Sequence, residues 1–348
     1  MNKKIILLYL SVFIAIFVLN IALSNNIVDN MIVAAAQNYD EIAEIGRQIT
    51  IDLNDICFKM RLAPAAVFPR WSNDKGRGAV EHNFWVGETP VTYELWYEVR
   101  IWAEEAGYRF ANPGIEGSNL GARISGAWME FENTGSAPTA RKKEPATMMN
   151  WRDAIIWSNA LSEMLGYEPV YRYKGKVIRE AGEQLDSYQL EEVDEAEQVN
   201  TDGFRLLTQE EWELAARYQG PAGSEQAIYM DGLYWTPGKF ASGAAKPARL
   251  PEGKEATGAV AWYENNSDTD GRKLRTQEVG LKKPNTLGLY DMSGNVREWT
   301  FTPNDSYQRL HGGHWHGSIN YLRVGRVYST RPWAFNSNSG LRLARTNF

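Results

Sequence analysis

The sequence predicts a mixed α+β fold that is irregular and rich in loops. Three segments have the apolar spacing and the end residues of helices, whereas residues 219–287 are rich in Gly, Pro and Asn with scattered aromatic residues. The second pattern is typical of short strands joined by long ordered loops. A hydrophobic share of 43%, with 13 Trp and 17 Tyr, indicates a folded chain rather than a disordered one.

Each of the three predicted helices begins at a residue that is a common N-cap. These residues are Thr92, Asn150 and Thr208. Acidic residues follow at the third helical position of the second and third helices, Asp153 and Glu211, as a capping box requires. The resulting predictions are helices over 93–107, 151–166 and 209–218.

The N-terminal segment has the pattern of an export signal. Two lysines precede an apolar run from Ile5 to Leu23, and such a positive end is held inside during export. Small residues near Ala22 and Ala34 offer cleavage sites, but the run is also nearly long enough to span a bilayer. We therefore predict an export signal or membrane anchor at residues 1–24. The rest of the chain is then extracytoplasmic: secreted, periplasmic or on the cell surface.

Residues 25–83 show no clear element and are predicted to form a spacer or stalk before a main domain at 84–348. The single cysteine of the chain, Cys57, lies in this spacer. One cysteine excludes an internal disulfide, a cysteine-based zinc site and any mechanism that uses two thiols. The net charge of -6 gives no general attraction to nucleic acid or to anionic membranes. Membrane contact is therefore expected only through residues 1–24, if they are not cleaved.

Five segments in a fixed order resemble a known family. They are FWVGETPVTYELW (84–96), PATMMNWRDAIIWSNALSE (145–163), FRLLTQEEWELAAR (204–217), NTLGLYDMSGNVREWT (285–300) and the pattern HGGHW…LRVGRV…SGLRLAR (311–345). Together they resemble the formylglycine-generating enzyme family, also called the sulfatase-modifying-factor domain. The resemblance covers about 84–345 and implies an irregular, loop-rich α+β fold of the C-type lectin type.

The resemblance does not extend to the catalytic residues of the family. Members that convert a sulfatase cysteine to formylglycine depend on two cysteines near the C-terminal end of the domain, where this chain has none. A thiolate is required to bind copper or to attack a substrate. Relatives that form carbon–sulfur bonds with iron have an additional histidine-bearing domain, which nothing before Phe84 supplies. We therefore predict a protein that is not an enzyme and has no redox cofactor.

Two alternatives remain to the non-catalytic prediction. One is a formylglycine-generating-type oxidoreductase, or a sulfatase-maturation-like enzyme, that works without cysteines. The other is a structural envelope protein. The absence of the cysteine pair disfavours the enzymatic alternative, and a binding protein is preferred to both.

The loop DMSGNVRE resembles the calcium loop of the family. The resemblance implies carboxylate ligands from Asp291 and Glu298 and backbone carbonyl ligands from Gly294 and Val296. Hard oxygen ligands on a tight loop suit calcium. The alternative is that Asn295 and Glu298 satisfy the backbone of the turn without any metal. A structural calcium ion is therefore one prediction for this loop.

The segment from His311 to Arg345 contains three of the four histidines and lacks Lys, Asp and Glu. A metal role for His311, His314 and His316 is disfavoured, because no acidic residue or cysteine lies nearby in the sequence. Arginines that alternate with aromatic residues also fit stacking on nucleic acid. That partner is not expected, because the protein is predicted to be exported and is acidic overall.

The same segment fits recognition of a variable ligand. Rigid aromatic rings among Ser, Gly and Asn are typical of antibody paratopes. From His314 to Ser339 there is no Lys, Glu, Gln, Met or Asp. All of these except Asp are unreachable when the adenines of an asparagine codon ending in C or T are randomised. The segment thus resembles the variable region of proteins diversified by retroelements, of the Treponema variable protein type. The resemblance implies an exported ligand-binding protein whose partner is an unknown protein or surface ligand.

The candidate variable region, 311–345, then divides into framework and ligand-facing positions. The predicted framework is Gly312, Gly313, Trp315, Leu322, Arg323, Val324, Gly340, Arg342 and Leu343. The predicted ligand-facing positions are His314, His316, Ser318, Tyr321, Gly325, Val327, Tyr328, Ser329, Trp333, Phe335, Asn336, Ser337 and Asn338. A tryptophan codon is not reachable from an asparagine codon, so a framework role is the alternative for Trp333. Lipid-anchored members of this type need a cysteine directly after the export segment, and Cys57 is too distant.

Overall fold

The computed structural model describes residues 44–118, 134–182, 197–269, 271, 274–302 and 306–347. Residues Gly46–Phe348 form one compact unit, and Met1–Ile45 group separately from it. The predicted export segment, 1–24, lies outside the described residues. Within the described ranges, no helix combines the length and the apolar character needed to cross a membrane.

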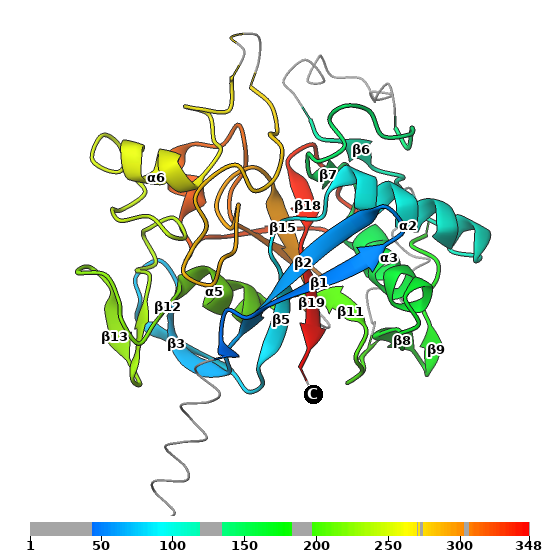
Figure 1. The fold of residues 1–348 in the computed structure, drawn as a ribbon, viewed down its shortest axis with the longest axis horizontal. Coiled ribbons are helices and arrows are strands. Elements are labelled where there is room, and N and C mark those ends of the chain that lie inside the picture. Colours follow the sequence, from blue (N-terminus) through cyan, green and yellow to red (C-terminus); the bar gives the residue numbers. More distant parts are fainter. Residues whose placement is uncertain are drawn as a thin grey trace, which may run out of the picture. The chain divides into compact units, whose positions relative to one another are not determined.

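A five-stranded antiparallel sheet joins the beginning and the end of the compact unit (Figure 1). Its order is β1 (Gln48–Leu53), β2 (Ile56–Ala63), β5 (Phe84–Gly87), β19 (Leu343–Thr346) and β11 (Phe204–Leu206). Strand β19 lies between β5 and β11 and pairs with both. The last described strand is therefore internal to this sheet.

The predicted spacer at 25–83 is wrong from Gly46 onward, and the folded unit begins well before Phe84. Strand β2 pairs with β5, and Met60 and Leu62 are buried in the core. A second hairpin, β3 (Ala66–Arg70) with β4 (Gly76–Val80), follows directly. The apolar and polar residues of ITIDL and FKMRL alternate, as in strands with one buried face.

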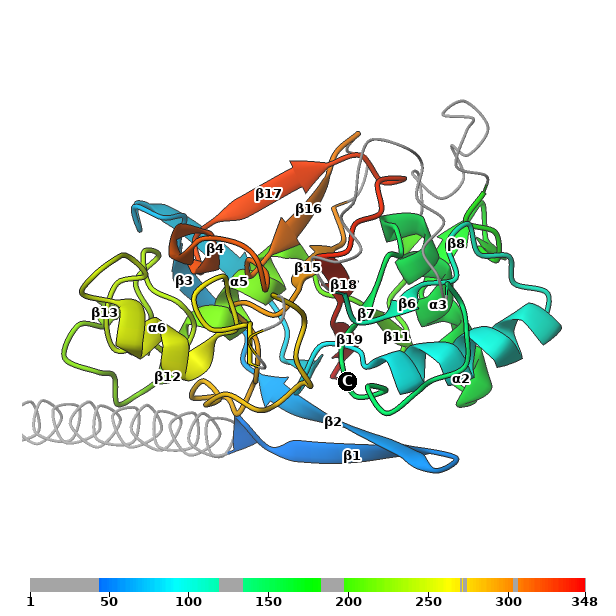
Figure 2. The same cartoon turned by 90° about the horizontal axis from the view of Figure 1, so that it is seen from above.

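The three predicted helices are confirmed. They are α2 (Tyr93–Glu105), α3 (Trp151–Met164) and α5 (Gln209–Arg217), to which the structure adds α6 (Lys254–Val260). Both capping boxes form, between Asn150 and Asp153 and between Thr208 and Glu211. Thr92 is the N-cap of α2 but makes no side-chain hydrogen bond there. In Figures 1 and 2, α2 and α3 lie on one side of β5 and β19, with α5 and α6 on the other.

A second sheet contains the C-terminal strands and carries the candidate site. Its order is β17 (Val327–Thr330), β16 (Gln308–His311), β15 (Arg297–Thr300) and β18 (Ser339–Leu341). Strands β15, β16 and β17 are antiparallel neighbours, whereas β18 runs parallel to β15. Figure 2 shows β17 on the side of the unit away from the β1–β2 hairpin.

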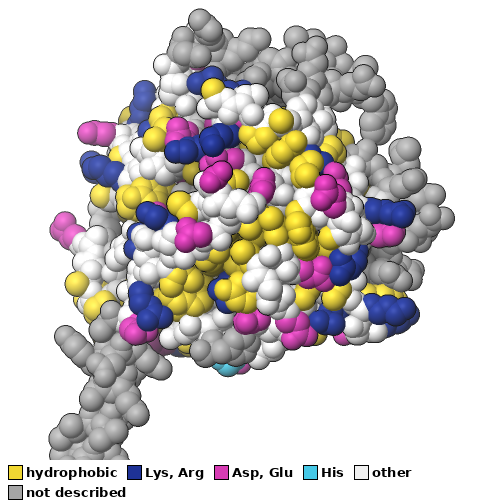
Figure 3. All heavy atoms as spheres, turned by 45° about the vertical axis from the view of Figure 1, so that its right-hand side comes forward, with side chains coloured by type: hydrophobic (Ala, Val, Ile, Leu, Met, Phe, Trp, Pro, Cys, Tyr) yellow, Lys and Arg dark blue, Asp and Glu magenta, His cyan; other side chains and the backbone are white. Residues whose placement is uncertain are grey.

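The other strands are short, as the sequence predicted for a loop-rich fold. They are β6 (Ile115–Glu116) with β7 (Ala146–Thr147), β8 (Tyr171–Tyr173) with β9 (Lys176–Val177) and β10 (Glu197–Gln198), and β12 (Tyr218–Gly220) with β13 (Ile228–Met230) and β14 (Leu233–Trp235). Aromatic contacts hold the elements together: Trp96 of α2 stacks on Trp157 of α3 with ring centroids 5.4 Å apart. On the face shown in Figure 3, side chains of both charge signs are interspersed among hydrophobic patches.

Candidate recognition site

The predicted variable region is built around one excursion of the chain between two strands of the second sheet. Strand β16 ends at His311 and β18 begins at Ser339, and both strands pair directly with β15. The excursion, here called the 312–338 segment, contains the 3-10 helix η2 (Ile319–Leu322) and strand β17. It is therefore held at both ends and along β17 by the same sheet.

Two glycines and a tryptophan fix the start of the 312–338 segment. Gly312 and Gly313 have φ angles of 93° and 72°, which favour glycine. A Cβ atom on Gly313 would lie 2.7 Å from the carbonyl oxygen of Tyr321. Trp315 is buried, and its indole Nε1 donates to the carbonyl oxygen of Ser337 at 3.1 Å. The beginning and the end of the segment are thus tied to each other.

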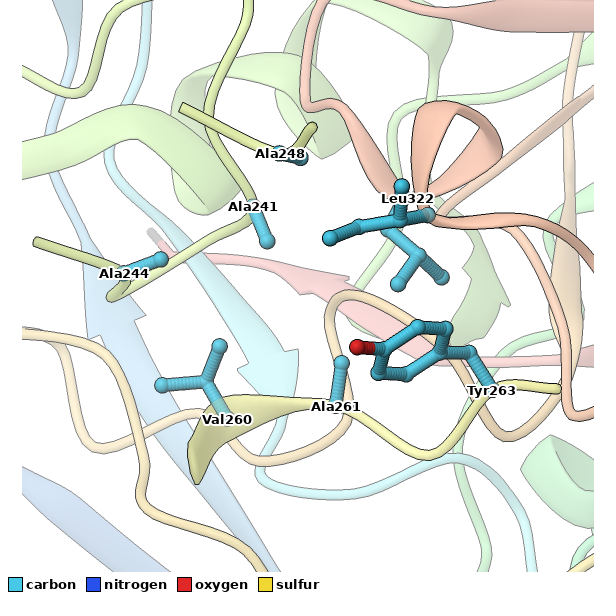
Figure 4. Packing of buried hydrophobic residues seen from close by; sticks show 8 residues of the cluster. Ala241, Ala244, Ala248, Val260, Ala261, Tyr263 and Leu322 are labelled. Carbon is cyan, nitrogen blue, oxygen red and sulfur yellow. The ribbon is translucent and has the colours of Figure 1, made fainter. Parts of the chain in front are cut away.

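Helix η2 is anchored by two apolar side chains. Ile319 and Leu322 are buried in a cluster with residues of 241–263. Figure 4 shows the Leu322 side chain facing Tyr263 in this cluster. Tyr321 lies beside these anchors and remains 40% exposed. The burial of its neighbours therefore fixes the backbone that presents this ring.

A buried ion pair supports the sheet beneath the segment. Arg342 and Glu298 are 0% and 1% exposed, and the guanidinium Nη2 lies 2.7 Å from the carboxylate Oε1. Arg342 also donates to the carbonyl oxygens of Gly87 and Tyr290, at 2.8 and 2.7 Å. Trp212 Nε1 donates to the other carboxylate oxygen of Glu298 at 2.6 Å. These contacts place Arg342 within the framework and not on the surface.

One of the two predicted carboxylate ligands of calcium is already paired within the fold. The carboxylate of Glu298 is engaged by Arg342, whose positive charge would repel a second cation. Asp291 accepts a hydrogen bond from the Gly280 amide through Oδ2, while its Oδ1 is buried without a partner. Burial raises the pKa of Asp291 to about 6. Glu298 thus has a structural partner in Arg342, and a calcium ion held by Asp291, Gly294, Val296 and Glu298 stays a prediction.

Most of the predicted ligand-facing positions are at least partly exposed. They are His316, Ser318, Tyr321, Val327, Tyr328, Ser329, Trp333, Phe335, Asn336, Ser337 and Asn338. Tyr328 is 43% exposed on β17. The predicted framework positions are buried, apart from the half-buried Arg323. Exposure thus follows the predicted division at most positions, with His314, Gly325 and Arg323 as exceptions.

Two of the predicted ligand-facing positions are buried, and for these the prediction is corrected. A Cβ atom on Gly325 would lie 2.5 Å from the backbone carbon of Trp71, so the close approach of these two backbones leaves room for glycine alone. His314 is only 7% exposed, and its ring centroid lies 4.2 Å from that of His316. Both residues belong to the support of the surface.

Arginine side chains cover the aromatic rings of the segment. Arg326 lies over Tyr321 at 4.4 Å, and Arg297 lies over Tyr328 at 4.1 Å from the ring centroid. Trp333 is flanked by Arg331 at 5.5 Å. Cation–π contacts of this kind hold both the ring and the guanidinium in place.

Three residues at this surface were not predicted from the sequence. Arg297 of β15 donates to the Asn338 side chain at 2.6 Å, Arg152 of α3 lies 5.6 Å from the Trp333 ring, and Tyr307 lies under Arg331 at 4.2 Å. All three lie outside the His311–Arg345 segment whose composition gave the signal. The only hint for Arg297 was its position in the loop motif NVREWT.

The histidines do not gather into a metal site. His311 is 1% exposed and stacks on Trp212 with ring centroids 4.7 Å apart. Neither of its ring nitrogens has a hydrogen-bond partner, and burial lowers its pKa to about 3. No group of three potential metal-binding side chains occurs in the part of the chain that the structure describes.

Comparison with known proteins identifies the class to which this fold belongs. The sulfatase-modifying factor enzyme 1-like domain matches residues 66–347, so the chain belongs to that family. Its irregular α+β architecture is the C-type lectin-like fold predicted from the sequence. The match begins at residue 66, which agrees with the earlier start of the folded unit.

The chain is similar in structure to Treponema denticola variable protein 1. The TM-score is 0.59 at 27% identity, and the match covers 86% of this chain and 99% of the other. In sequence, it is 27% identical to the Chaperone protein LppX of Paenibacillus barcinonensis, over 63% of this chain and 76% of that protein. It is 32% identical to the Inactive C-alpha-formylglycine-generating enzyme 2 of Mus musculus, over 41% and 43% respectively. The family therefore includes members that are not active enzymes.

Proposed function

We propose that this protein is an exported, non-catalytic binding protein whose 312–338 segment presents the side chains that contact the ligand. The observation that carries the proposal is the alternation of buried and exposed positions in that segment. Trp315, Ile319 and Leu322 are buried anchors, while Tyr321 and Tyr328 point out with two-fifths of their surface exposed. A rigid backbone that presents aromatic rings loses little entropy on binding.

The non-catalytic part of the proposal rests on the lack of cysteine thiols near the 312–338 segment. Residues 58–348 contain no cysteine, and Cys57 lies on β2 of the other sheet. The chemistry of an oxidase that needs a copper-bound thiolate is therefore not available near the 312–338 segment. The similarity to a family member that is named inactive supports the same conclusion.

The second part of the proposal is that the exposed positions vary within a population. The similarity to a protein named a variable protein and the absence of four residue types from 314–339 support this proposal. Variation needs a scaffold that tolerates it, and partly exposed side chains tolerate substitution better than buried ones. Export to the cell surface or beyond is proposed from residues 1–24. It fits the binding function because a ligand of this kind would lie outside the cytoplasm.

Resequencing of the 3′ end of the gene across a growing population tests the proposed variation. We expect substitutions at the exposed positions, with Gly325, Trp315 and Leu322 unchanged. An invariant 3′ end beside scattered changes elsewhere would contradict the proposal. A neighbouring reverse-transcriptase gene with a near-copy template of the segment would support it.

The enzymatic alternative has a separate test. Purified protein is analysed for bound copper and iron, with a cysteine-containing formylglycine-generating enzyme as the reference. We expect no stoichiometric copper or iron in this protein. One equivalent of copper per chain would overturn the non-catalytic proposal.

A further inference from the structure

Four arginines at the recognition surface, Arg297, Arg323, Arg326 and Arg331, differ from the framework arginines because they pair with no carboxylate among the described residues. From residue 306 to 347 the described chain contains arginines but no Lys, Asp or Glu. Arg323, Arg326 and Arg331 form no ion pair with any carboxylate in the described ranges, and neither does Arg297. The described residues therefore do not neutralise the positive charge of these four arginines.

Arg323 lies near other positive charges and is hydrogen-bonded only to neutral acceptors among the described residues. Burial and the nearby charges of Arg326 and Arg249 lower the pKa of its guanidinium. The groups that face Arg323 are the Ala248 carbonyl oxygen and the side chain of Asn320, which accept its hydrogen bonds without contributing charge. The surface thus has a local excess of positive charge, although the whole protein carries a net charge of -6.

A guanidinium group held over an aromatic ring can still bind a carboxylate. A guanidinium that lies over an aromatic ring uses its face for that contact, while its N–H donors lie in its own plane. Those donors can bind both oxygens of a carboxylate at once. Arg326 and Arg331 are exposed side chains held over Tyr321 and over Tyr307, so their donor edges are accessible to a partner.

We propose that the ligand of the 312–338 segment is a protein surface rich in Asp and Glu, bound by Arg326 and Arg331 between exposed tyrosine rings. This inference rests on the binding function proposed above and specifies the chemistry of its partner. Tyr, Trp and Arg are the residues enriched at the centres of protein interfaces. Interfaces also gain specificity and association rate from complementary charge.

A long polyanion fits the surface less well than a protein does. Binding of nucleic acid or sulfated polysaccharide relies on many contiguous positive charges and on release of counterions. Here the charges are few and separated by rings, and the acidic whole molecule repels an extended polyanion. Discrete carboxylates act within the short screening distance of about 8 Å at physiological ionic strength, where the local positive charge dominates.

Selection of peptides on the full-length protein tests the inference. The probe is a phage-displayed library of random peptides, selected on wild type and on the variant Arg326→Gln/Arg331→Gln. The matched control is Arg77→Gln/Arg109→Gln, because these two arginines are also exposed but pair with Asp231 and Glu180. We expect Asp and Glu to be enriched over Asn and Gln in peptides selected on wild type and on the control.

The selected acidic peptides are then measured against all the variants. We expect the Arg326→Gln/Arg331→Gln variant to bind these peptides about tenfold or more weakly than wild type. The control variant should bind them with unchanged affinity. Peptides without acidic enrichment, or equal affinity in both double variants, would overturn the acidic-ligand inference. Tighter binding to heparin or single-stranded DNA than to the peptides would overturn the choice of a protein partner.

One further variant separates this inference from the binding function itself. Tyr321→Ser/Tyr328→Ser removes two exposed rings without changing the charge. If these changes abolish binding while the arginine changes do not, the recognition surface stands and only the ligand class is wrong. If neither pair of changes affects binding, or no peptide is selected at all, the proposed function fails as well.

Discussion

Arginine has two different environments in this protein. In the framework, Arg205, Arg217 and Arg342 are 4%, 0% and 0% exposed and pair with glutamates that are buried as well. On the recognition surface, Arg326 and Arg331 are exposed, lie over aromatic rings and have no carboxylate partner in the described part of the chain. The charges of the framework arginines are balanced within the fold, whereas the N–H donors of Arg326 and Arg331 are accessible to another molecule.

The difference separates arginines on which the fold depends from arginines that it can lose. A buried arginine without its glutamate would be an uncompensated charge, so the framework pairs depend on each other. Substitution of an exposed arginine, or of the ring beneath it, should cost the protein little stability, because solvent replaces the lost contact. The comparison therefore predicts large effects of substitution in the framework and small effects on the surface.

The largest effect is expected for Arg342→Met. This change leaves the Glu298 carboxylate buried with Trp212 as its remaining side-chain donor. Breaking a buried pair in this way costs about 3–5 kcal/mol of unfolding free energy. Chemical denaturation of wild type and variant measures the difference, and the double variant Arg342→Met/Glu298→Gln should recover part of it. A loss below about 1 kcal/mol would show that the pair is not structural.

The next effect is a pH dependence that arises from His311. Its pKa is about 3 in the folded protein and 6.5 in its ordinary state, so the folded form excludes a proton that the unfolded chain binds. The stability that depends on neutral His311 is complete above pH 6.5 and is lost as the pH falls toward 3. The loss is about 1.4 kcal/mol per pH unit within that window.

The variant His311→Phe isolates this contribution. It keeps a ring against Trp212 but cannot bind a proton. Asp153 and Asp291, whose pKa values burial raises to about 6, favour the fold as the pH falls and act equally in both proteins. Denaturation at several pH values should show a steeper loss of stability for wild type than for the variant below pH 6.5. Parallel curves would mean that His311 is not held neutral.

A smaller effect is expected for Gly325→Ala. The added Cβ would lie 2.5 Å from the Trp71 backbone, so the two segments must move apart, at a cost of about 1–3 kcal/mol. The matched control is Ser329→Ala at an exposed position of β17. Thermal unfolding of both variants compares them directly. Equal melting temperatures would restore Gly325 to the ligand-facing set.

The smallest effect is expected for Arg326→Gln. The side chain is exposed and lies over the Tyr321 ring, so the unfolding free energy should change by less than about 0.5 kcal/mol. The same denaturation assay checks this value. A loss as large as that of Arg342→Met would remove the distinction between the two sets of arginines.

The sequence predicted the elements whose signals are local. Capping boxes of neighbouring residues gave the starts of α3 and α5, and both starts are confirmed. The β1–β2 hairpin was missed, although its residues alternate, because its buried face is completed by β5. A short alternating segment without its partner strand is weak evidence for a strand.

The candidate site was predictable as a segment but not as a surface. Composition alone singled out 311–345, and the buried set around Trp315 and Leu322 agrees with the predicted framework. Gly325 could not be assigned, because the backbone that excludes its side chain belongs to Trp71. Arg297 and Arg152 could not be included, since distant elements bring them to the rings of Tyr328 and Trp333.

The position of β19 between β5 and β11 has a consequence for synthesis of the protein. Strand β19 leaves the ribosome after the 312–338 segment, yet the first sheet cannot close without it. A stop codon or frameshift within the segment therefore removes an internal strand and exposes the edges of two others. Chains that lose the reading frame within the segment therefore cannot form the pairs that β19 makes with β5 and β11.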